Sequence, residues 1–121
     1  MGVLGFGGFF FRSRDPKALA AWYQEHLGVG PAPGSAAPIW QTQGGPVVFQ
    51  PFKQDSDYFA ADKAFMINFR VSDLDGMIKR LKASGIPVET RAEWDAPDVG
   101  RFARVHDPEW NAIELWEPPA G

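Results

Sequence analysis

The sequence predicts an α+β fold made of two tandem βαβββ modules, whose curved mixed sheets would surround a shared cavity. An apolar run precedes Asp15, and a second apolar run precedes Asp73, 58 residues further along the chain. Each aspartate opens a segment with the apolar spacing of a helix. Both segments run into a glycine and are followed by short strand-like stretches. The sequence therefore predicts two consecutive copies of the same βαβββ unit.

The first helix has clear boundaries. Residues 3–12 are rich in phenylalanine and are expected to form the strand that leads into it. Asp15 is a favourable N-cap residue, and Pro16 suits the first helical position. Gly28 follows the last residue with helical apolar spacing and is expected to end the helix.

A hairpin is expected after this helix. Residues 39–42 and 47–52 are its predicted strands, and Gly44-Gly45 is its turn. Residues 54–63 are polar apart from Tyr58 and Phe59, which is typical of a linker. The predicted division is a first module at residues 1–53, a linker at 54–63 and a second module at 64–121, together forming one compact domain.

The second half repeats this order. Asp73 is expected to cap a helix that carries one apolar stripe and stops at Gly85. The strands expected around it are residues 64–71, 87–90, 101–105 and 112–116, the last two joined as a hairpin.

Strand alternation predicts which side chains face the cavity. Successive residues of a strand point to opposite faces, so Ile67, Phe69, Ile113 and Leu115 are expected to face the helices. The side chains expected on the concave face are Phe10, Arg12, Gln50, Phe52, Met66, Asn68, Arg70, Glu114 and Trp116. This mixture of apolar and polar groups is typical of a small-molecule pocket.

Composition excludes several classes of function. The net charge of −3 provides no basic field, so neither nucleic acid nor an anionic membrane is an expected partner. No apolar run reaches the roughly 20 residues of a membrane span. The chain has no cysteine, which excludes disulfides and thiolate chemistry and agrees with a cytoplasmic location, the one we expect.

Several motifs resemble the vicinal oxygen chelate superfamily, which includes glyoxalase I, extradiol dioxygenases and bleomycin-binding proteins. The stretches that carry the resemblance are residues 11–16, 69–75 and 107–118. In order and spacing they span essentially the whole chain. The resemblance implies paired βαβββ modules with a cavity between them, and often a homodimer. Whether the modules pair within one chain or exchange between two is left open.

The resemblance also implies four metal-ligand positions, which map to Gly8, Met66, Glu114 and Gln50. Glycine offers no side chain, and a thioether does not suit a hard or borderline divalent ion. No cofactor is therefore expected. If a divalent metal (Ni, Zn, Mn or Fe) were bound, Gln50 and Glu114 would be its ligands.

Two functions follow from this pattern. The first is a protein that binds a small, partly aromatic or anionic molecule between its modules, without a catalytic metal. The alternative is a metal-dependent lyase, isomerase or dioxygenase-type enzyme of the same superfamily, for which Glu114 is the best catalytic candidate. Arg12 and Arg70 would clamp an anion or pair with surface carboxylates. Trp110 stands where such turns usually carry glycine, so the turn is expected to differ or to be strained.

Overall fold

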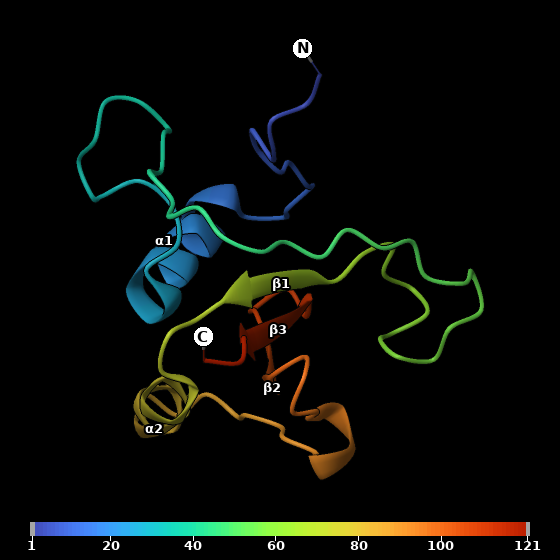
Figure 1. Ribbon diagram of the computed structural model, residues 1–121. Coiled ribbons are helices and arrows are strands. Elements are labelled where there is room, and N and C mark those ends of the chain that lie inside the picture. Colours follow the sequence, from blue (N-terminus) through green and yellow to red (C-terminus); the bar gives the residue numbers. More distant parts are fainter. Residues whose placement is uncertain (1, 121) are drawn as a thin grey trace.

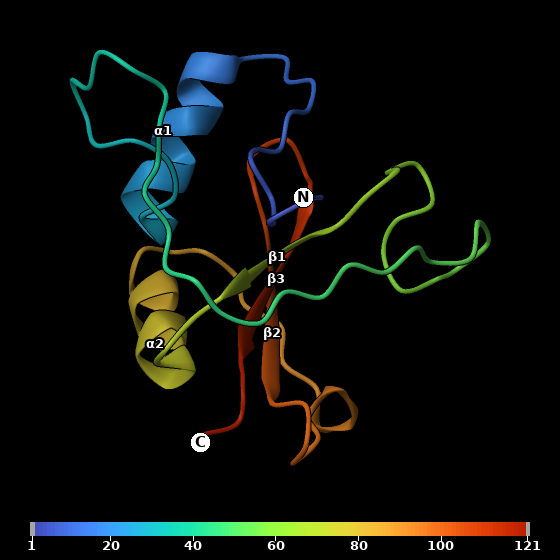
Figure 2. The same ribbon diagram turned by 45° about the horizontal axis from the view of Figure 1, so that its top comes forward.

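The computed structural model describes residues 2–120. In chain order the elements are α1 (Pro16–Leu27), β1 (Ile67–Arg70), α2 (Leu74–Ala83), the short 3₁₀ helix η1 (Ala92–Trp94), β2 (Arg101–His106) and β3 (Ala112–Glu117) (Figure 1). Both α-helices lie on one side of the sheet, and the green segment around residues 45–60 lies on the other side (Figures 1 and 2). We call the sheet face that points away from the two α-helices the open face, because no α-helix of the described residues covers it (Figures 1 and 2).

The sheet has three strands in the order β1-β3-β2. β3 lies at its centre, parallel to β1 and antiparallel to β2. The predicted strand at residues 87–90 is reduced to a single bridge between Glu89 and Arg104 at the outer edge of β2. The expected hairpin of the second half is confirmed as β2 and β3.

Both helices begin and end where the sequence predicts. The Asp15 carboxylate accepts a hydrogen bond from the Ala18 N–H at 3.2 Å, and that of Asp73 accepts one from the Gly76 N–H at 3.0 Å. Gly28 ends α1 with a left-handed φ of 67°, a conformation that costs glycine little. The two equivalent caps confirm that the helical part of the unit is repeated.

The core lies between the helices and one face of the sheet. Leu74 and Leu81 of α2 pack with Ile113 and Leu115 of β3, and all four are at most 1% exposed. Tyr23 of α1 joins the same cluster. Ile113 and Leu115 therefore face the helices as predicted, which directs Glu114 and Trp116 to the opposite face.

The first half differs from expectation, because its predicted strands are absent. Residues 3–12 and the expected hairpin at 39–52 contain no strand among the described residues. Near the expected turn, the Arg70 guanidinium donates to the carbonyls of Gln43 and Pro46 at 2.8 and 2.6 Å. The carbonyls of Gln43 and Pro46 therefore accept hydrogen bonds from a side chain and not from a neighbouring strand. Pro46 also has no N–H to donate to a strand partner.

The turn between β2 and β3 joins the two halves. Asp107, which is 2% exposed, accepts hydrogen bonds from the Tyr23 hydroxyl at 2.7 Å and from the Asn111 N–H and side-chain amide at 3.0 and 2.8 Å. Trp110 has a φ of 66°, in the left-handed region that favours glycine. The turn therefore keeps the backbone conformation of a glycine turn and is strained at Trp110, which is one of the two outcomes that the sequence predicts. Its ring stacks on His106 at 4.2 Å between centroids.

The mixed α+β class is confirmed, and the two-module architecture is visible in part. The second half forms its helix and three paired strands, with a fourth present as one bridge. The first half contributes its helix, but among residues 2–120 its expected strand segments do not join a sheet. No helix among residues 2–120 is both long and apolar enough to cross a membrane.

Candidate functional site

Three polar side chains lie in one row across the open face of the sheet. Glu114 of β3 is in register with Asn68 of β1 on one side and with Arg104 of β2 on the other. Each neighbouring residue along β3 belongs to the helix-facing core, so these three side chains share the face that points away from the helices. The row is fixed by strand register rather than by loops.

Glu114 is a buried carboxylate, 8% exposed, with both oxygens in use. Oε1 accepts a hydrogen bond from the side-chain amide of Asn68 at 2.8 Å, and Oε2 accepts one from the Tyr58 hydroxyl at 2.6 Å. Burial and the bond to this carboxylate raise the pKa of Tyr58 to about 12. The phenol therefore stays protonated near neutral pH and acts as a donor to Glu114.

Arg104 lies beside this carboxylate between two aromatic rings. Its Cζ is 4.6 Å from the ring centre of Tyr58 and 5.0 Å from that of Trp94, both within the range of cation–π attraction. Nη2 approaches the Met66 sulfur at 3.8 Å. The Nε atom is buried and has no hydrogen-bond partner among residues 2–120. A buried donor without an acceptor destabilises the folded protein, and a ligand oxygen that accepted its hydrogen bond would remove that cost.

Further aromatic groups extend the site along the strands. Trp116 and Phe102 stack at 6.3 Å with ring planes 5° apart, and the Trp116 indole N–H donates to the Val99 carbonyl at 2.8 Å. Phe52 meets the Tyr58 ring edge-on at 5.6 Å. The open face thus combines a few fixed polar groups with several aromatic surfaces, as ligand sites do.

The structure brings together part of the predicted set. Met66, Asn68 and Glu114 lie in one cluster, Trp116 lies on the same face of β3, and Phe52 reaches the cluster through the Tyr58 ring. Arg70, at the end of β1, is held by the carbonyls of residues 43 and 46.

The other predicted residues lie elsewhere. Phe10 is 93% exposed, Gln50 is exposed, and Arg12 lines a separate cavity. All three belong to the segments that do not join the sheet, so strand alternation did not place them.

Three residues of the cluster lie outside the predicted set of pocket residues: Tyr58, Trp94 and Arg104. Arg104 could have been found, because alternation along the expected strand at 101–105 places it on the same face as its hairpin partner Glu114. Tyr58 gave a weaker signal as one of two aromatic residues in a polar linker. No periodic pattern marks Trp94, which lies in the short helix η1.

The divalent metal implied by the resemblance does not fit this donor set. Among residues 2–120, no group of three His, Cys, Asp or Glu side chains comes together as a metal site. The Met66 sulfur is approached by the cationic Arg104, and both oxygens of Glu114 accept hydrogen bonds. A second cation at this point would meet the guanidinium charge with one carboxylate to offset it.

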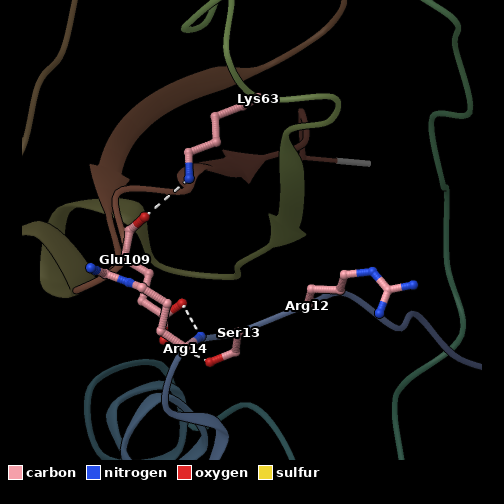
Figure 3. A pocket seen from close by; sticks show the side chains of 5 residues that line it. All are labelled: Arg12, Ser13, Arg14, Lys63 and Glu109. Atoms are coloured by element: carbon pink, nitrogen blue, oxygen red, sulfur yellow. Dashed lines mark hydrogen bonds between the residues drawn. The ribbon is translucent and has the colours of Figure 1, made fainter.

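A separate cavity of about 410 Å³ lies between the start of α1 and the β2–β3 turn, lined by Arg12, Ser13, Arg14, Lys63 and Glu109 (Figure 3). The Glu109 carboxylate accepts hydrogen bonds from the Ser13 hydroxyl at 2.6 Å and from the Arg14 N–H at 2.8 Å. Lys63 donates to the Glu109 carbonyl at 3.1 Å. Glu109 therefore supplies the anion that the first turn of α1 favours.

Comparison with known proteins agrees with this architecture. The sequence matches the glyoxalase-like domain family over residues 8–116. TnmS3, an antibiotic binding protein from Streptomyces sp. CB03234, aligns over 98% of both chains with a TM-score of 0.56 and 20% identity. TioX from Micromonospora sp. ML1 aligns over 90% of this chain and 92% of its own, with a TM-score of 0.52 and 17% identity. No curated protein sequence matches.

At these identities the two structures establish a shared fold, while the family match covers most of the chain. The motifs that resemble the vicinal oxygen chelate superfamily lie largely inside the matched region. The chain belongs to the glyoxalase-like domain family of this superfamily.

Proposed function

We propose that this protein binds a small, partly aromatic or anionic molecule on the open face of its sheet, without a catalytic metal. The observation that carries the proposal is the row of Asn68, Glu114 and Arg104, in which a buried carboxylate and an incompletely bonded guanidinium lie among aromatic rings. Such a face offers stacking surface and a few directed polar contacts.

Two further points support binding rather than turnover. One of the similar structures is itself described as an antibiotic binding protein. In addition, Arg104 lies against Met66 at a position where the superfamily resemblance implies a metal ligand. A guanidinium can recognise an anionic oxygen of a ligand directly, without a metal to polarise it.

The test is a ligand screen by thermal shift and native mass spectrometry against anionic and neutral aromatic compounds, with metal analysis of protein purified without chelators. We expect substoichiometric metal and at least one aromatic ligand. Arg104→Gln should weaken binding of an anionic hit about tenfold or more, because it removes a charge-assisted contact.

Arg101→Gln is the matched control. It removes the same charge from the same strand, but Arg101 pairs with the exposed Asp75 at 2.6 Å on the other face. Binding should change little in this variant. Equal loss in both variants, or a stoichiometric Ni, Zn, Mn or Fe ion released by Glu114→Ala, would contradict the proposal.

We further propose that the protein is a homodimer. One chain exposes 9231 Å², whereas a compact monomer of its mass exposes about 6,500 Å². Most of the exposed large hydrophobic side chains that the structure describes lie on the first-half segments outside the sheet, where Phe49 is 81% exposed and Phe10 is 93% exposed. An interface of standard size buries only about 800 Å² on each partner, so this apolar surface is ample for a second copy.

Light scattering should give twice the 13.4 kDa of one chain. Phe49→Glu should shift the mass toward one chain, because a charge would be desolvated in the interface. Lys79→Glu, on α2, is the control and should leave the mass unchanged. A single-chain mass for the unmodified protein would reject the dimer without affecting the ligand proposal.

A further inference from the structure

Tyr58 covers the candidate site although it belongs to neither the sheet nor a helix. It lies in the segment between the two halves, where residues 53–63 contain no helix or strand. This segment lies on the sheet side opposite the helices (Figures 1 and 2). Apart from Phe52, the groups that Tyr58 meets are carried by regular elements: Glu114 by β3, Arg104 by β2 and Trp94 by η1.

The contacts of Tyr58 are those that a bound aromatic molecule would make. Its hydroxyl donates to the buried Glu114 carboxylate at 2.6 Å. One face of its ring lies under the Arg104 guanidinium at 4.6 Å, and the ring meets Trp94 at 6.2 Å with a 61° interplanar angle. A phenol on a separate molecule could form each of these contacts, since none of them requires the polypeptide backbone of Tyr58.

One polar group is left unsatisfied while Tyr58 is in place. The buried Nε of Arg104 has no acceptor among residues 2–120, and its guanidinium lies over the face of the Tyr58 ring, with Cζ 4.6 Å from the ring centre. A ligand with a second oxygen next to its hydroxyl would supply the missing acceptor. The site therefore favours an aromatic ring that carries both a hydroxyl and a neighbouring acceptor oxygen.

We propose that Tyr58 fills the site in the ligand-free protein, and that the ligand which displaces it is a hydroxylated aromatic compound with a neighbouring acceptor oxygen. The ligand hydroxyl donates to Glu114, its second oxygen accepts from Arg104, and its ring takes the place of the Tyr58 ring beside Trp94. This inference rests on the proposed binding function and names its ligand class.

Because Tyr58 and the ligand exclude each other, the fraction of molecules with Tyr58 displaced limits the apparent affinity. The probe for this competition is 2,3-dihydroxynaphthalene, whose binding can be followed by fluorescence and by ¹H–¹⁵N spectra that report the Trp94 indole. Tyr58→Ala should bind it about tenfold more tightly than the unmodified protein. Tyr58→Phe, which keeps the ring but frees Glu114, should bind it with intermediate affinity.

Phe59→Ala is the matched control, since it removes the neighbouring aromatic ring of the same segment, whose ring contact is with Phe52. It should leave the affinity within about twofold, which separates loss of the Tyr58 ring from loosening of the segment. 2,3-Dimethoxynaphthalene, which has no hydroxyl donor, should bind Tyr58→Ala at least tenfold more weakly than the diol, and adding Glu114→Gln should remove this preference.

Equal or weaker binding by Tyr58→Ala would overturn the inference, because Tyr58 would then be part of the binding surface rather than its competitor. Failure of the diol to bind any variant would also overturn it. If another aromatic compound from the screen still bound with dependence on Arg104, the proposed function would stand. If no compound bound at all, the proposed function would fall as well.

Discussion

Asp107→Ala is expected to lower the free energy of unfolding by about 3–5 kcal/mol. The carboxylate is 2% exposed and accepts four hydrogen bonds, from the Tyr23 hydroxyl, the Glu109 N–H and two donors of Asn111. Its removal leaves buried donors without an acceptor. Urea unfolding at fixed protein concentration measures the loss, since concentration alone shifts the stability of an oligomer.

Tyr23→Phe isolates one of these bonds. The hydroxyl donates to Asp107 at 2.7 Å, and the ring remains in the core, so the loss should be about 1–2 kcal/mol. Burial, and then the bond to Asp107, raise the pKa of Tyr23, so the neutral phenol is the form that the fold favours. If Asp107→Ala cost no more than Tyr23→Phe, the hydrogen bonds that Glu109 and Asn111 donate to Asp107 would contribute nothing to stability.

Gly100→Ala is expected to cost about 3 kcal/mol or more and to disturb the open face. Gly100 has a φ of 126°, and an added Cβ would lie within 3 Å of both the Glu117 carbonyl and the Trp116 indole nitrogen. Backbone strain and a clash with the end of β3 therefore act together. Urea unfolding measures the cost, and the fluorescence spectrum should change because the Trp116 indole must move.

Gly85→Ala is the control for the strain alone. Gly85 also has a positive φ, 79°, but nothing lies within 4 Å of the position of an added Cβ. This variant should lose about 1 kcal/mol and keep the fluorescence of the unmodified protein. Equal losses in the two glycine variants would show that the close approach of Gly100 to β3 carries no cost.

The predictability of the fold differs between the two halves for a physical reason. Helix boundaries at Asp15 and Asp73 depend on local capping, which the sequence carries directly. Pairing of β2 with β3 depends on a short connection, and alternation then determines which residues face the core. Residues 3–12 and 39–52 have strand composition, but a strand also needs a neighbour, and composition does not say where that neighbour lies.

The predictability of the site residues also depends on whether they lie on paired strands or on connecting segments. Glu114 and Asn68 were predicted because they lie on paired strands with a fixed alternation, and Met66 directly precedes β1. Tyr58 and Trp94 approach the sheet from a connecting segment and a short 3₁₀ helix, and their positions depend on tertiary contacts with Arg104 that no local pattern encodes.

The β2–β3 turn also has a consequence for the order of events during synthesis. The Glu109 carboxylate bonds to the Ser13 hydroxyl and the Arg14 N–H, and Asp107 bonds to Tyr23. On the ribosome, α1 emerges well before either acidic residue has been made. The first helix therefore lacks its buried hydrogen-bond partner until the last hairpin of the chain has been made, and its apolar face stays uncovered during that interval.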